Sequence, residues 1–209
     1  MGKYTALLDW RISHLVTGGY ICEELCELLE HALKEVDREL EDIRDGDWDA
    51  MEKLMYALIL SGLVMQMAGS TWPVSGAEHM AAHLWDMKDP ERKRDSLHGE
   101  EVGVALVLVT EHYKKLEKAI RHGLVKVRSD SARGLEMGLL EKTFPDTEVL
   151  EGVLADNDPN PLDEIDLEKL EDQLDQIRDL IHDLPESYEI VQKLNEAGCV
   201  TRPEAIGLT

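Results

Sequence analysis

Three histidines lie close together in a segment that is otherwise largely apolar. His79 and His83 belong to GAEHMAAHLW, and His98 follows in LHGEEVGV. Residues four apart on a helix share one face, so the first two imidazoles could bind a single ion. His98 lies at the expected start of the next long helix, from where it can be directed back at the preceding helix. Two such histidines and a carboxylate would make a three-ligand metal site with open positions for a substrate oxygen.

The same histidines allow a structural interpretation. Their spacing is that of the HExxH motif, but Met80 follows His79 where a metalloprotease needs its glutamate base, which excludes that class. Histidines at helix ends also serve as caps or as hydrogen-bonded core groups. The residues alone therefore leave metal ligation and a structural role equally open.

Composition limits the partners of the chain. Its 209 residues, 43% of them hydrophobic, can form one domain with its own core. The net charge of −22 repels phosphate backbones and anionic lipid headgroups. We therefore expect neither nucleic acid nor a membrane as a partner, and one domain over residues 1–209.

Other segments of the sequence predict where the chain is located in the cell and whether its cysteines form disulfides. The run ALILSGLVMQMAG, from Ala57, is shorter than the ~20 apolar residues that cross a bilayer, and predicts a buried helix. The first residues lack the apolar core of a secretory signal, which predicts a cytoplasmic location. Three cysteines, an odd number, predict buried free thiols: Cys22, Cys26 and Cys199.

Apolar residues recur at helical spacing along nearly the whole chain. Helices are expected over 3–16, 20–44, 48–68, from Ser75 as N-cap to Met87, from Glu100 to Gly123, and in the acidic segment 160–185. Breaks are expected at Gly18-Gly19, Asp45-Gly46-Asp47 and Asp89-Pro90, with Asp47 as an N-cap. No strand-helix alternation is found, so the predicted fold class is all-α.

Signatures of nucleotide binding are missing from the sequence. There is neither a GxGxxG after a strand nor a GxxxxGKS/T loop. The chain by itself is therefore not expected to bind a dinucleotide.

Several motifs together resemble one enzyme family. SGLVMQMAGSTWPVSGAEHMAAHLWDM, followed by LHGEEVGVALVLV, is similar to the C-terminal half of NAD(P)-dependent sn-glycerol-1-phosphate dehydrogenases. KYTALLDWRISH and LNEAGCVTRPEAIGL extend the resemblance to both ends of the chain. The family belongs to one superfamily with glycerol dehydrogenase, iron-containing alcohol dehydrogenases and 3-dehydroquinate synthase. The resemblance implies a helical metal-binding domain here and an N-terminal Rossmann-like domain that this chain lacks.

The resemblance also implies roles for individual residues. His79 and His98 would bind a catalytic divalent metal, and His83 would be a pocket neighbour, with core packing as its alternative role. The family's third ligand is an aspartate in a GxGD motif just upstream of KYTALLDW, before the first residue of this chain. Asp9 lies two turns along the first helix, roughly 10 Å or more from its start, and is expected to be structural.

Other positions depart from the family pattern. Trp72 stands where the family has an arginine, and Glu101 where a lysine is common, which weakens recognition of an anionic substrate. Val74 replaces an alanine. Ser70, Ser75 and Gly76 remain and could still present hydroxyl and backbone donors to a substrate, although a turn or cap would explain them equally well.

These features lead to three hypotheses about function. The chain would be the metal-binding half of a glycerol-1-phosphate dehydrogenase, which interconverts sn-glycerol 1-phosphate and dihydroxyacetone phosphate, completed by a separate nucleotide-binding chain. Alternatively it is a non-catalytic helical assembly module, or a fragment of a full enzyme. Alone it is expected to be inactive, to bind Zn²⁺, Ni²⁺ or Fe²⁺ weakly, to use NAD(P) only with a partner, and to form homo-oligomers through an exposed apolar wall.

Overall fold

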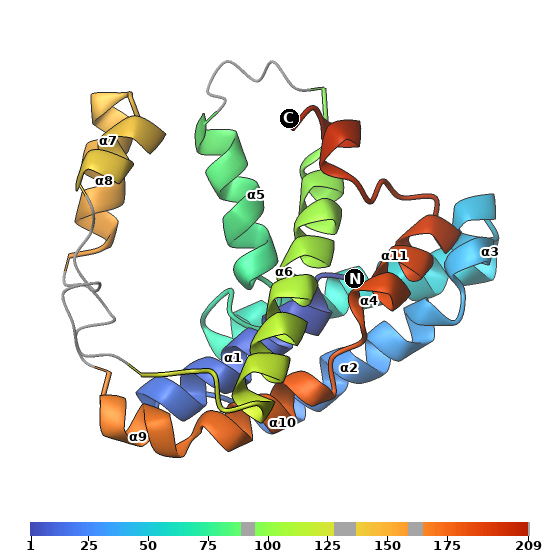
Figure 1. Cartoon of the computed structure of the whole chain (residues 1–209). Helices are drawn as coiled ribbons and strands as arrows, with labels where there is room; N and C mark the ends of the chain where they lie inside the picture. The colour runs from blue at the N-terminus through green and yellow to red at the C-terminus, as the bar shows by residue number, and fades with distance from the viewer. Residues whose placement is uncertain (89–94, 128–136, 159–164, 209) are drawn as a thin grey trace.

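Helices account for every regular element that the computed structural model describes, in residues 1–88, 95–127, 137–158 and 165–208 (Figure 1). The predicted all-α fold class is therefore confirmed. In chain order the helices are α1 (Lys3–Thr17), α2 (Glu23–Asp37), α3 (Leu40–Asp45), α4 (Trp48–Ala68), α5 (Ala77–Lys88), α6 (His98–Arg121), α7 (Met137–Thr143), α8 (Thr147–Asp156), α9 (Leu167–Asp172), α10 (Leu174–His182), α11 (Ser187–Glu196) and the short 3-10 helix η2 (Pro203–Ile206).

Two predicted helices have the expected ends. The α1 helix stops at Gly18, whose φ of 71° is the left-handed conformation that glycine adopts without strain. The α4 helix begins after Asp47, whose carboxylate accepts hydrogen bonds from the backbone N–H groups of Asp49 and Ala50 at 3.0 and 3.1 Å. The predicted N-cap is therefore confirmed.

The helix predicted over 20–44 is instead two helices. The chain leaves α2 at Arg38 and Glu39, whose amides bond back to the carbonyls of Glu35 and Val36. The short α3 then packs against α4 and α11, with Leu40 only 4% exposed. Tertiary packing sets this break, because no glycine or proline in the segment predicts it.

Helices α5 and α6 pack along each other and carry the three histidines. The valine-rich start of α6 is buried, as expected for a core helix: Val102, Gly103, Val104, Ala105 and Leu106. The predicted break at 89–90 lies outside the described residues.

The core is built around α1. Leu7 and Trp10 pack with α2 and α4, where Leu29 and Val64 are buried. Leu8, on the other side of α1, packs with Ile120, Ile177 and Ile181 of α6 and α10. A third cluster joins α6 to α11. The first helix therefore fixes both the α2–α4 pair and the α6–α10 pair.

The acidic segment forms two helices, α9 and α10, divided at Gln173. Helices α7 and α8 were not predicted, and they lie to one side of the others (Figure 1). Among the cysteines, which are free, Cys26 is buried, Cys22 half-buried and Cys199 exposed. The prediction of a buried thiol is therefore wrong for Cys199, which follows the left-handed Gly198 at the end of α11.

The prediction that α4 is a buried helix is also wrong. Only one side of α4, with Ala50, Ser61 and Val64, faces the core. Its apolar face is exposed and consists of Met51, Met55, Tyr56, Leu58, Ile59, Leu63 and Met67. With 21 residues, α4 is the one helix in the described residues long and apolar enough to cross a membrane, and 17% of its apolar window is buried. Length and composition alone are weak evidence of a membrane span.

Candidate metal centre

Helices α5 and α6 bring the three histidines to a common space. The ring centroids of His79 and His98 are 5.9 Å apart, and those of His83 and His98 are 5.1 Å apart with planes inclined by 25°. His79 and His83 lie one turn apart on α5, and His98 is the first residue of α6. The two predicted ligands therefore lie near each other, and metal binding by them stays a prediction.

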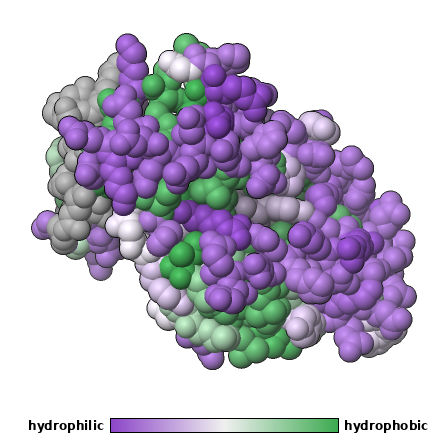
Figure 2. All heavy atoms as spheres, turned by 90° about the horizontal axis from the view of Figure 1, so that it is seen from below, coloured by the Kyte–Doolittle hydropathy of each residue, from purple (hydrophilic) through white to green (hydrophobic). Residues whose placement is uncertain are grey.

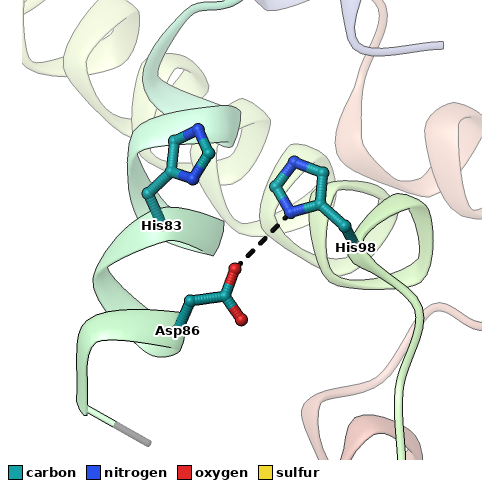
Figure 3. A group of neighbouring side chains, drawn as sticks. All are labelled: His83, Asp86 and His98. Atoms are coloured by element: carbon teal, nitrogen blue, oxygen red, sulfur yellow. Dashed lines mark ion pairs between the residues drawn. The ribbon is translucent and has the colours of Figure 1, made fainter. Parts of the chain in front are cut away.

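Asp86, which was not predicted, is part of the same group. It lies three residues after His83 on α5, and its Oδ2 is 3.7 Å from Nδ1 of His98. One ligand atom from each of His83, Asp86 and His98 lies within 4.8 Å of the other two (Figure 3). The sequence signal was available, because helical residues at i and i+3 share a face.

A second carboxylate, Glu78, orients His79. Its Oε1 lies 2.7 Å from Nδ1 of His79 and accepts a hydrogen bond from the Gly76 N–H at 3.0 Å. Its Oε2 accepts a hydrogen bond from the Thr5 hydroxyl at 2.5 Å. Burial of Glu78 tends to raise the pKa of its carboxyl, but the bonds from His79, Thr5 and Gly76 hold that pKa below its usual value.

The contact with Glu78 decides which ring nitrogen of His79 can face a ligand. An ionised carboxylate accepts the proton of Nδ1, which leaves Nε2 as the lone-pair nitrogen. Histidines that bind metals commonly donate their other ring nitrogen to a carboxylate in this way. Sequence reasoning missed Glu78, because a charged residue on a helix is expected in solvent and this one is fully buried.

Asp9 has the structural role that was expected. Its Oδ2 accepts a hydrogen bond of 2.6 Å from the backbone N–H of Ala77, and its Oδ1 accepts one from the Tyr113 hydroxyl. Burial is the main cause that raises the pKa of Asp9 to about 6, against which both hydrogen bonds act. The first amide of α5 is thus bonded by α1, and the helix begins two residues after the predicted cap, Ser75.

Of the donors expected in the turn before α5, the backbone N–H of Gly76 is already engaged, whereas in the described part of the chain the hydroxyls of Ser70 and Ser75 are not. The Gly76 N–H is bonded to Glu78. Within the described residues, neither Ser70 nor Ser75 forms a side-chain hydrogen bond, and both are partly exposed. Trp72 is exposed and Val74 is buried in the α1–α2–α4 core.

Glu101 does not add charge to the surface of the site. It is buried on α6 and accepts a hydrogen bond of 2.7 Å from the Ser96 hydroxyl. The expected weakening of anionic-substrate recognition by Glu101 stays a prediction.

The start of the chain passes beside His79. A Cβ atom placed on Gly2 would lie 3.3 Å from Oε1 of Glu78 and 3.6 Å from Cε1 of His79. The segment before α1 is therefore adjacent to the imidazole.

The side chains at this site suit a transition metal, because imidazole nitrogens and carboxylate oxygens together bind Zn²⁺, Ni²⁺ and Fe²⁺.

Fold and site together define an all-helical domain that brings three histidines from two adjacent helices to a common space. No family model matches the chain. Curated proteins that are similar to it are named glycerol-1-phosphate dehydrogenase, NAD(P)+. That of Geobacillus stearothermophilus is 29% identical over all 209 residues, and that of Aeropyrum pernix is 35% identical over 153 residues, or 73% of this chain. The chain is therefore homologous to the C-terminal part of the glycerol-1-phosphate dehydrogenases.

The match covers only part of these relatives. This chain spans 44% of the length of the Geobacillus stearothermophilus protein and 41% of that from Aeropyrum pernix. A shorter but closer match, 41% identical over 117 residues, is found with the protein of Bacillus licheniformis.

Proposed function

We propose that this chain is the metal- and substrate-binding half of a glycerol-1-phosphate dehydrogenase-like oxidoreductase. The reaction would interconvert sn-glycerol 1-phosphate and dihydroxyacetone phosphate with NAD(P). The observation that carries the proposal is the convergence of His79 and His98, from two helices, at a ring distance of 5.9 Å. Support also comes from the relatives, which are similar to this chain from its first residue to its last.

Within this half, the protein's own groups would prepare the site. Glu78 holds the proton of His79 at Nδ1, so that Nε2 is directed to a ligand. Asp9 fixes the start of α5 by bonding the Ala77 amide, which sets the position of His79 two residues later. A bound divalent ion would supply Lewis acidity toward an alcohol or carbonyl oxygen.

NAD(P) would have to be bound elsewhere. The chain carries no glycine-rich phosphate loop, and its homologues extend well beyond the part that it matches. A nucleotide-binding part, as a separate chain or in a longer polypeptide, would provide that site. Because the segment before α1 lies against His79, such a part could also bring an aspartate ligand to the ion.

A non-catalytic role in assembly is the second candidate. It is favoured by the exposed apolar face of α4 and by Trp72, which replaces the arginine that would contact an anionic substrate. Coexpression of this chain with the part of the Geobacillus stearothermophilus protein that it does not match distinguishes the enzymatic role from the assembly role. NAD(P)H-dependent reduction of dihydroxyacetone phosphate supports the enzyme, whereas a stable but inactive complex that binds Zn²⁺ supports assembly.

The metal-binding part of the proposal is tested on the chain itself. We expect the double variant His79→Ala, His98→Ala to lose the uptake of Zn²⁺ and Ni²⁺, measured by equilibrium dialysis and metal analysis. His112→Ala is the matched control, because this exposed histidine lies 14 positions along α6, about 21 Å at 1.5 Å per residue. Equal uptake by the double variant and the control would remove the metal site from the proposal.

A further inference from the structure

Thr5 of α1 forms a hydrogen bond with the carboxylate that orients His79. Its side chain is fully buried, and its hydroxyl donates to Oε2 of Glu78 at 2.5 Å, across 73 positions of the sequence. The hydroxyl oxygen also lies 3.2 Å from the carbonyl oxygen of Gly2. A hydroxyl has one proton, and the shorter bond to an ionised carboxylate is the stronger of the two. Thr5 is therefore a donor to Glu78.

The contact between Glu78 and His79 depends on how the carboxylate is turned. Neighbouring residues of a helix normally point in different directions, so a bond between their side chains needs a fixed rotamer. Oε1 lies 2.7 Å from Nδ1 of His79 and 3.0 Å from the Gly76 nitrogen, whereas Oε2 is bonded by Thr5. Thr5 therefore holds the second carboxylate oxygen, and with it the orientation of the first.

A second bond from α1 holds the backbone of α5 independently of Thr5. Asp9 lies one turn after Thr5 on α1 and accepts a hydrogen bond of 2.6 Å from the N–H of Ala77, the residue before Glu78. Loss of the Thr5 hydroxyl leaves this bond in place. A substitution of Thr5 can therefore change the orientation of Glu78 without releasing α5 from α1.

Without the hydroxyl, a buried carboxylate oxygen of Glu78 would lose its donor from α1. A buried acceptor without a donor is unfavourable, so the carboxylate would turn toward other donors or toward water, and Oε1 would leave Nδ1 of His79. The imidazole would then have no acceptor that keeps its proton on Nδ1. An unconstrained histidine in water favours the proton on Nε2, and a protonated Nε2 has no lone pair for a metal ion.

We propose that the Thr5 hydroxyl, acting through Glu78, keeps His79 in the tautomer with its proton on Nδ1 and its lone pair on Nε2. Thr5 is thus a positioning residue for the candidate metal centre. This role rests on the proposed function only for what Nε2 binds. The tautomer itself is a property of the metal-free chain and can be measured there.

Long-range proton–nitrogen correlation spectra of the imidazoles measure the tautomer of His79. The metal-free full chain is used at about pH 8, where histidines are in general neutral, and the His79→Ala spectrum assigns the signals. We expect Thr5→Val to lower the ratio of the Nδ1–H to the Nε2–H tautomer at least about tenfold, the effect of one hydrogen bond to a charged group.

Two further variants control for the loss of a hydroxyl. Thr5→Ser keeps the donor and should give the wild-type ratio. Thr110→Val is the matched control, because Thr110 is also fully buried and its hydroxyl forms no hydrogen bond within the described residues. It should leave the tautomer of His79 unchanged.

Zn²⁺ affinity, measured by competition with a chromophoric chelator, tests whether the tautomer matters for the ion. Thr5→Val should weaken binding about tenfold or more, the range for groups that orient a metal ligand. In the His79→Ala background the same substitution should not weaken the residual binding further, because Thr5 acts through that imidazole. Equal weakening in both backgrounds would show a purely structural role and overturn the positioning role.

The outcomes separate this inference from the proposed function. An unchanged tautomer ratio in Thr5→Val, with the helices intact by circular dichroism, overturns the inference and leaves the proposed function standing. A changed ratio, in a chain that takes up Zn²⁺ equally with and without His79 and His98, supports the inference and removes the proposed metal site. If the valine variant does not fold, Thr5→Ala gives the same test, because alanine lacks the hydroxyl and occupies less space.

Discussion

At the scale of single residues, the carboxylates of Glu78 and Asp9 fix the positions of the groups around the candidate metal centre. Glu78 binds the imidazole of His79, the amide of Gly76 and the hydroxyl of Thr5, and Asp9 binds the amide of Ala77. Both are buried or nearly so, although the chain is strongly acidic and most of its carboxylates are exposed. Buried carboxylates are stable only when donors surround them, so these two fix the geometry of α5 against α1.

Asp9 should make stability depend on pH. Its pKa is raised from 3.8 to about 6 in the folded protein, so the folded state binds more protons than the unfolded chain between these values. The contribution of Asp9 to stability is therefore largest below pH 3.8 and is lost as the pH rises through about 6. Asp9→Asn cannot titrate and lacks this dependence.

The difference in unfolding free energy between wild type and Asp9→Asn is the quantity to measure, by urea denaturation. From pH 5 to pH 7.5 the wild type should lose about 1.4 kcal/mol relative to the variant. Other carboxylates cancel in this comparison because both proteins contain them. A constant difference, or a relative gain by the wild type, would mean that Asp9 titrates in its ordinary range.

At the scale of elements, the approach of α1 to the start of α5 depends on Gly76. A Cβ atom at this position would lie 2.8 Å from Cα of Ala6 and 2.9 Å from Oε2 of Glu78. The first of these is backbone, which cannot move aside without shifting α1. The glycine is needed here for space, and the hydrogen bonds of Glu78 and Asp9 depend on the same close approach.

Gly76→Ala should therefore destabilise the fold by about 3 kcal/mol, the upper range for an overpacked core position. Gly152→Ala is the matched control, because Gly152 lies inside α8, away from the apolar face of α4, with open space where its Cβ would be. That control should gain about 0.5–1 kcal/mol from helix propensity. Urea unfolding measures both, and equal stabilities of the two variants would show that α1 and α5 can separate without cost.

At the scale of the whole molecule, the apolar face of α4 is the largest departure from a typical soluble surface. Its seven side chains are 41% to 68% exposed. The face of the molecule drawn in Figure 2 is largely hydrophilic, with a broad hydrophobic area toward the bottom of the view and smaller ones near its centre and top. With about 200 Å² for each large side chain, the apolar area is on the order of 750 Å². Monomers rarely expose more than about 300–600 Å² in one patch, and a stable interface buries about 800 Å² per partner.

Two copies of this chain can meet through that face in spite of their charge. Residues 54–68 contain no charged side chain, so contact there does not place like charges against each other. We expect the purified chain to form dimers or larger oligomers, and Ile59→Glu to shift it toward monomer, measured by sedimentation equilibrium. Gln192→Glu adds the same charge at an exposed position on α11 and should leave the mass unchanged. An unchanged mass of Ile59→Glu would exclude α4 as the interface.

The sequence by itself determined the helical class and the boundaries of α1, α4, α5 and α6 to within about two residues. Periodicity, the glycine after α1 and the carboxylate of Asp47 are local signals, and local hydrogen bonds decide them. The proximity of His79, His83 and His98 was also predictable, since two turns of one helix and the start of the next must lie together. The resemblance to the glycerol-1-phosphate dehydrogenases was also visible in the sequence, because short motifs carry it.

Only the tertiary structure decided what surrounds these residues. Glu78 is buried beside His79 partly because Thr5, 73 positions away in the chain, donates a hydrogen bond to its carboxylate, whereas the bond from the Gly76 N–H is local. The break between α2 and α3 follows from packing against α4 and α11. The apolar sequence of α4 predicts burial, but its exposure depends on which other helices pack against it, and its apolar face is exposed. Burial is a property of contacts between distant segments, and no local pattern of residue types contains that information.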